Sequence, residues 1–136
     1  AEDRSMKSMN REKLLKNMTD QGLERLRQIQ AAQREDLSNY NVDEFIRHDR
    51  EFHSCIYEMS LNRELMKLAS NYYDVFRFLG MQAVMGTEER RLTTIEEHQD
   101  ILEAMEQHNP KAAVQAMKKH MEQTETNIRR HIKIAP

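Results

Sequence analysis

Helix-breaking residues are scarce in this sequence of 136 residues, which contains only three glycines and two prolines. So few breakers favour long helices joined by short loops. Strands are not expected, because no stretch alternates apolar and polar residues for long and valine is scarce. Internal repeats and low-complexity tracts are absent as well. The sequence therefore predicts one all-α domain that is long enough to bury a hydrophobic core.

Other absences narrow the classes of protein to which the chain can belong. A single cysteine, Cys55, excludes an internal disulfide and fits a reducing compartment such as the cytoplasm. No apolar run is long enough to span a bilayer and no signal peptide is visible, so no membrane contact is expected. The net charge is −2 and no cluster of lysine and arginine dominates one face, so we do not expect this chain by itself to bind nucleic acid.

Apolar residues recur with the spacing of amphipathic helices along most of the chain. We predict six helices. The first covers residues 3–17, and the second begins at Thr19 or Asp20, either of which is a good N-cap, and carries an apolar stripe as far as Leu37. The other four cover residues 42–59, 63–85, 88–107 and 110–132. The first is weak and reads like a linker from a longer protein, so we separate residues 1–18 from a bundle over 19–136. The fourth is apolar on more than one face, so it is either central in the bundle or shared with a second subunit. Thr87 and Asn109 are good N-caps, and short connections between the helices predict an antiparallel bundle.

Four polar side chains fall on the apolar faces of these helices. His53 follows Phe52 on the apolar face of its helix, and Asp49 lies one turn before it on the same side. His98 and His120 lie on the apolar faces of the fifth and sixth predicted helices. Three helices therefore each turn an imidazole towards the interior, and one of them adds a carboxylate.

Each of these side chains also has an ordinary structural explanation. A lone histidine on an apolar face is usually a core residue with satisfied hydrogen bonds, and Asp49 and His53 alone are often a local pair. A buried carboxylate without partners is costly, however, and buried imidazoles need hydrogen-bond partners. One shared cation satisfies all four groups, and three imidazoles with one carboxylate suit zinc first, and also nickel, manganese or iron. We therefore predict a divalent metal in a central pocket, held by Asp49, His53, His98 and His120.

Residues near these four positions are candidates for binding a ligand. Arg91 lies seven residues before His98, on the same helical face, so it is either a cation that pairs an anion near the metal or part of a surface ion pair. Arg77 is a similar candidate on the fourth helix. Tyr72 either supplies a hydroxyl group to a ligand or packs as plain core. Glu97 directly precedes His98 but points about a quarter turn away, so we expect it to be exposed to solvent.

Two segments resemble a known family. "DREFHSCIYEMSLNREL" is similar to a D-x-x-F-H…N-x-x-L pattern, and "EEHQDILEAMEQHNPKAAVQAMKKHME" is similar to an E-H-x-x-I-L-x-A…A-x-x-x-M-x-x-H pattern. Both patterns resemble the FCD effector domain, which is the C-terminal domain of the FadR-type subfamily of GntR transcription regulators. The resemblance covers roughly residues 19–125. It includes Asn62, the asparagine of the first pattern, which we count among the candidate ligand contacts.

The resemblance implies an all-helical bundle that holds a divalent metal through Asp49, His53, His98 and His120. It also implies a small organic acid, typically a carboxylate, bound at or beside the metal, and a homodimer. In the family, an N-terminal winged helix-turn-helix domain binds operator DNA. We expect that domain to be missing from this chain, so the regulator would contact DNA only through the missing domain. The first helix departs from the family, because the residues around Arg4 do not match the family pattern. Six helices rather than seven place the chain nearer the VanR-like group.

The leading hypothesis is a ligand-sensing and dimerisation domain of a bacterial GntR-family transcription regulator, which is not an enzyme. One alternative is a helix-bundle metalloenzyme, in which an open metal position activates water. Against it, no further carboxylate is an evident general base, and the Glu-x-x-His pattern of di-iron bundles is absent, since Met117 stands three residues before His120. The other alternative is a metal-free interaction bundle, whose melting temperature would not respond to a chelator.

Overall fold

Five α-helices make up most of the chain in a computed structural model, which describes the backbone of residues 2–79 and 85–131 and the side chains of residues 19–72, 74 and 85–130. The helices are α1 (Glu2–Ser38), α2 (Val42–Met59), α3 (Arg63–Leu79), α5 (Glu88–Glu106) and α6 (Pro110–His131). No strand occurs in the described ranges, so the all-α prediction is confirmed. In those same ranges, none of the helices combines the length and the apolar character needed to cross a membrane.

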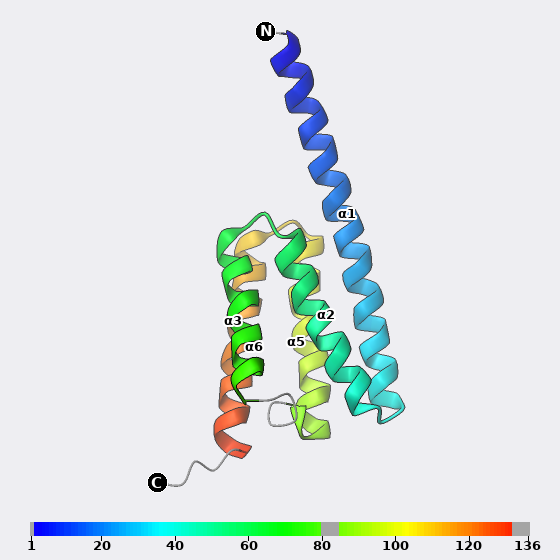
Figure 1. The fold of residues 1–136 in the computed structure, drawn as a ribbon, viewed down its shortest axis with the longest axis vertical. Coiled ribbons are helices and arrows are strands. Elements are labelled where there is room, and N and C mark those ends of the chain that lie inside the picture. The colour runs from blue at the N-terminus through cyan, green and yellow to red at the C-terminus, as the bar shows by residue number, and fades with distance from the viewer. Residues whose placement is uncertain (1, 80–84, 132–136) are drawn as a thin grey trace.

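The first two predicted helices are one continuous helix, α1, so the described residues form five helices where six were predicted. The predicted break depended on Thr19 and Asp20 as N-caps, but helix-forming residues flank them on both sides and continue the helix. Gly22 does not interrupt it either. A Cβ atom at this glycine would come within 2.7 Å of Met59 Sδ, so the glycine lets α1 and α2 approach closely. Figure 1 shows α1 continuing well beyond the other helices at its N-terminal end; the domain boundary at residue 18 stays a prediction.

The later helices begin at capping side chains. Thr87 Oγ1 accepts a hydrogen bond from the backbone N–H of Arg90 at 3.1 Å, and Asn109 Oδ1 accepts one from that of Ala112 at 3.0 Å. Both N-caps are as predicted. The bounds of α2 are those predicted, and α5 and α6 each end within one residue of the prediction. The last part of the predicted fourth helix, residues 80–84, lies outside the described residues.

The five helices form a closed ring around one core. Helix α1 packs against α2 and α5, α3 packs against α2 and α6, and α5 packs against α6. Helices that follow one another along the chain run in opposite directions (Figure 1), as predicted for a bundle with short connections. Helix α3, predicted to be central or shared with a second subunit, forms one wall of this ring, and most side chains in its C-terminal half lie outside the described residues.

Two groups of buried apolar side chains fill the ring, and the buried histidines His53 and His98 each contact an aromatic residue of one group. The larger group includes the fully buried side chains of Leu26, Phe52, Ile56, Ile101 and Met117. The smaller group includes Phe45, Ile46, Tyr72, Met85 and Ile95. Phe52 of the larger group stacks on His98, with ring centroids 4.0 Å apart, and Tyr72 of the smaller group stacks on His53 at 3.7 Å. The core therefore holds the histidine rings between aromatic side chains.

Candidate metal centre

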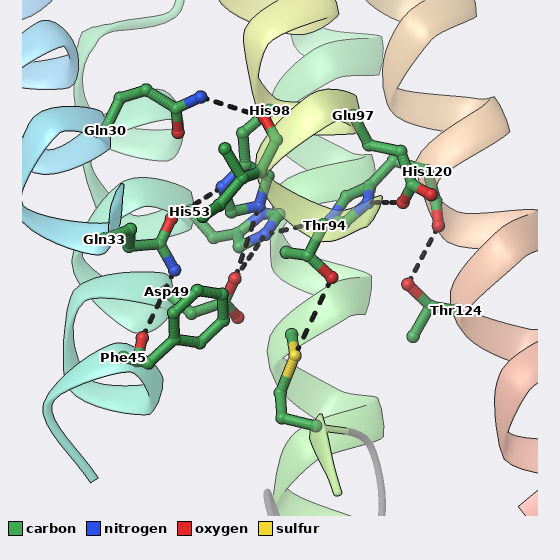
Figure 2. A network of polar contacts seen from close by, with 12 residues as sticks. Gln30, Gln33, Phe45, Asp49, His53, Thr94, Glu97, His98, His120 and Thr124 are labelled. Atoms are coloured by element: carbon green, nitrogen blue, oxygen red, sulfur yellow. Dashed lines mark hydrogen bonds and ion pairs between the residues drawn. The ribbon is translucent and has the colours of Figure 1, made fainter. Parts of the chain in front are cut away.

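Three histidine rings from three helices meet in the core of the bundle. His53 on α2, His98 on α5 and His120 on α6 each place one ring nitrogen within 4.8 Å of the other two. Asp49, one turn before His53 on α2, brings a carboxylate to the same place. Figure 2 shows the four side chains converging from their separate helices. None of the four residues is more than 1% exposed, so the group is sealed from bulk water.

The donor atoms are close enough to share one cation. Asp49 Oδ1 lies 3.3 Å from His98 Nε2 and 3.9 Å from His53 Nε2. The Nε2 atoms of His53 and His120 are 3.3 Å apart. Donor atoms bound to a tetrahedral zinc ion at about 2.0–2.1 Å lie about 3.3 Å from one another. Two of these three distances match that value, and the three histidines place their nitrogens within 4.8 Å of one another, so the histidines fit a divalent metal of this size, with the Asp49 carboxylate beside two of them.

Unpaired buried atoms support the same assignment. Both carboxylate oxygens of Asp49 and the Nε2 atom of His98 lack a hydrogen bond of normal geometry to any residue in the described part of the chain. A buried polar atom left without a partner costs about 1–3 kcal/mol, and a charged one costs more. A cation bound by these atoms would remove that cost, so the donor set fits a metal.

Gln33 on α1 sets the orientation of His98. The Nδ1 atom of His98 donates a hydrogen bond to Gln33 Oε1 at 2.9 Å, and Gln33 Nε2 donates one to the backbone carbonyl of Phe45 at 3.2 Å. A proton on Nδ1 leaves a lone pair on Nε2, the nitrogen that faces Asp49. Metal-binding histidines are commonly fixed in this way by an acceptor on the other nitrogen.

Glu97 does the same for His120, which corrects the expectation that Glu97 is exposed. The Nδ1 atom of His120 lies 2.5 Å from Glu97 Oε1, and the Glu97 side chain is only 13% exposed. Arg90 pairs with both oxygens of this carboxylate at 2.8 Å and donates to Thr124 Oγ1 at 2.9 Å. The hydroxyl of Thr124 in turn donates to the backbone carbonyl of His120 at 2.8 Å. This network joins α5 to α6 beside the histidines, and Figure 2 shows its contacts from Glu97 and from Thr124 to His120.

At neutral pH the four central groups have the protonation states that bind metals. Burial lowers the pKa of His98 to about 3. Burial likewise lowers the pKa values of His53 and His120 well below the ordinary value for histidine. Burial raises the pKa of Asp49 to about 6, which leaves this carboxyl group mostly ionised at pH 7. The centre therefore presents neutral imidazoles and a carboxylate, as a metal requires.

The chain matches the sequence model of the FCD domain over residues 9–123. The chain belongs to the FCD domain family. The family resemblance read from the sequence is thereby confirmed. FCD domains are effector-binding, regulatory domains of GntR-family transcription regulators and are not a family of enzymes. No curated protein and no solved structure gives a significant match to the chain.

The candidate ligand contacts of this FCD domain are not gathered in one place. Tyr72 stacks on His53 and lies beside His120, with ring centroids 4.9 Å apart. Arg91 instead donates from Nη1 to the backbone carbonyl of Met85 at 2.7 Å. Asn62 is apart from these residues, because it caps the start of α3 through a hydrogen bond from the Leu65 N–H. The side chain of Arg77 lies outside the described residues. Their ligand roles stay predictions.

Sequence reasoning missed the residues that support the histidines from outside. Glu97 and Arg90 are seven residues apart on α5, which puts them on one helical face. Arg91 and His98, one position further along α5, have the same seven-residue spacing, and Arg91 was the arginine predicted to lie near the metal. Gln33 carries a weaker signal: it continues the apolar stripe of α1 and is fully buried. Nothing in the sequence says that Gln33 contacts His98, because 65 residues separate them.

Proposed function

We propose that this FCD domain is the ligand-sensing and dimerising part of a GntR-family transcription regulator of the FadR type. It binds one divalent metal ion, zinc before nickel, manganese or iron, through Asp49, His53, His98 and His120. It also binds a small organic acid at or beside the metal, and it acts as a homodimer. A winged helix-turn-helix domain outside this chain contacts DNA.

The convergence of buried donor atoms is the observation that carries this proposal. Three imidazoles whose pKa values are lowered by burial form a set that could hold a metal ion, and two of them, His53 and His98, lie beside the carboxylate of Asp49. Two of those imidazoles have their outer nitrogens bound by Gln33 and Glu97. Without a metal, the Asp49 oxygens have no hydrogen bond of normal geometry in the described part of the chain, and burying a carboxylate in that state is costly.

The residues of the chain prepare the site, and the bound metal would supply a Lewis-acidic position for a carboxylate oxygen. Gln33 and Glu97 hold His98 and His120 in one tautomer, so that their Nε2 lone pairs face the centre. The surrounding aromatic rings exclude water. Tyr72 is the candidate ligand contact that lies against the histidines, and we propose that its hydroxyl group contacts the bound acid.

The positions of the four metal-binding side chains explain how metal binding would change the domain. The four side chains come from α2, α5 and α6, so a bound metal ties three helices of the ring together. Metal binding of this kind contributes to the folding free energy. An acid that binds one arrangement of the dimer more tightly than another shifts the population towards that arrangement.

Elemental analysis of the purified protein tests the metal. We expect about one equivalent of metal per chain, and none in the double variant His98→Ala/His120→Ala. The matched control is His108→Ala, since His108 is an exposed histidine beyond the end of α5. Metal content that is unchanged in the double variant would sink the proposal. Mass spectrometry under native conditions then reports the bound acid and the number of subunits in the same sample.

A further inference from the structure

A small polar cleft opens between the start of α5 and the last turns of α6. It has a volume of about 150 Å³, and every residue that lines it is polar, including three threonines and two arginines, Arg90 and Arg130. Neither Asp49 nor any of the three central histidines lines this cleft. Glu97, which lines the cleft and binds His120 Nδ1, lies between the two sites. The cleft is therefore separate from the metal centre.

Arg90 is a buried cation with one donor unused. The residue is 5% exposed. Its Nη1 and Nη2 atoms bind Glu97, and Nη2 also binds Thr124. The Nε atom is buried and has no hydrogen-bond partner in the part of the chain that the structure describes. A buried donor on a charged group is costly to leave unpaired, so an acceptor oxygen that reached Nε from the cleft, which Arg90 lines, would be stabilising.

The cleft is lined by two arginines and two glutamates, so its formal charges cancel, and the case for an anion depends on where these charges lie. Glu97 does not oppose an anion strongly, because Arg90 and His120 already bind its oxygens. The guanidinium group of Arg130 adds a second positive charge to the lining. The N-terminus of α5, a helix of 19 residues, contributes a partial positive charge at the same end. The opposing charge of Glu89 is exposed to solvent, as is the charge of Arg130, so both are screened, and Arg90 is the buried charge of the lining.

We propose that this cleft binds a small oxyanion, of the size of inorganic phosphate or of a single carboxylate group. The Nε atom of Arg90 donates to one oxygen of the anion, and Arg130 pairs with the anion from the side of α6. The threonine hydroxyls supply further donors. Phosphate and carboxylate share this chemistry, and the experiment distinguishes them.

Calorimetric titration of the purified protein with sodium phosphate, and separately with sodium acetate, at constant ionic strength tests the proposal. We expect saturable binding of at least one of the two anions. Arg130→Gln should weaken it by about three- to fivefold, and Arg90→Lys, which keeps the charge but loses Nε, should weaken it further. The matched control is Arg129→Gln, which removes an exposed charge from the neighbouring position on α6, where Arg129 pairs with Glu125, and should leave binding unchanged.

Two results would overturn the proposal. One is the absence of saturable binding of either anion. The other is binding that Arg130→Gln leaves unchanged, or that Arg129→Gln weakens equally, because the anion would then bind elsewhere or respond only to net charge. The Arg130 variant keeps the test decisive even if Arg90→Lys does not fold, since Arg130 is exposed. The metal content of the same samples, measured separately, shows whether the metal centre itself is present.

Discussion

Replacing Glu97 by Gln tests how the metal centre is supported from outside. Glu97 Oε1 lies 2.5 Å from His120 Nδ1, and the carboxylate pairs with Arg90 through two contacts of 2.8 Å. Glutamine keeps the shape of the side chain but removes its charge, so His120 becomes a weaker ligand and the buried Arg90 loses its counter-ion. Loss of such a supporting group typically lowers metal affinity by about 10–100-fold, which corresponds to about 1.4–2.7 kcal/mol.

Competition with a chromophoric chelator measures this affinity directly. Circular dichroism should show that Glu97→Gln retains its helices, so that the weaker binding reports on the site and not on unfolding. The matched control is Glu96→Gln, which removes the same charge from an exposed neighbouring position and should change the affinity by less than about twofold. If Glu97→Gln bound the metal as tightly as the unaltered protein, the reasoning about the outer contacts of the histidines would be refuted.

Three further predictions concern the same core. Removing the metal with a chelator should lower the melting temperature by about 10 °C, because a ligand at about 100 times its dissociation constant contributes about 2.7 kcal/mol; an unchanged value in a thermal melt would indicate a metal-free bundle. Gln33→Leu leaves His98 Nδ1 without its acceptor and should lower the free energy of unfolding in urea by about 1–3 kcal/mol, whereas the exposed Gln28→Leu should change it by less than about 0.5 kcal/mol. In the metal-free protein the free energy of unfolding should fall as the pH drops from about 6.5 towards 4, because the three buried histidines, whose folded-state pKa values are lowered, take up protons there only when unfolded. Below about pH 6 the raised pKa of Asp49 instead stabilises the folded state, but Asp49 is one group and the histidines are three. Urea titrations that gave a constant free energy of unfolding over the same pH range would contradict the burial of the histidines.

Local patterns in the sequence predict most of the fold. The caps at Thr87 and Asn109 and the apolar stripes give the ends of the later helices, because these features depend on residues within one or two turns. The break predicted near Thr19 failed for a related reason. A capping residue starts a helix only where the preceding chain has left the helical conformation, and the residues before it favour the helix.

The candidate site was accessible to sequence reasoning only in part. Periodicity places Asp49 and His53 on an inner face, and it does the same for His98 and His120, but it does not give their depths in the bundle. That depth depends on how α2, α5 and α6 pack. The outer contacts were harder to predict, because the orientation of Glu97 depends on Arg90 and on the closeness of α6.

Helix α1 contacts the histidine centre and extends far beyond it. Gln33 accepts from His98, and Gln30 donates to the backbone carbonyl of Ile95 at 2.9 Å, so two buried side chains hold this helix against α5, and the exposed Arg34 and Arg27 add contacts to the same helix. From Gln33 back to Glu2 the helix is uninterrupted, and at about 1.5 Å per residue this length is roughly 46 Å. A tilt of about 5° at the fastening point displaces the distant end by roughly 4 Å. A change at the metal centre that tilted the whole of α1 would therefore be largest at its N-terminal end, beyond the residues that pack on α2 and α5.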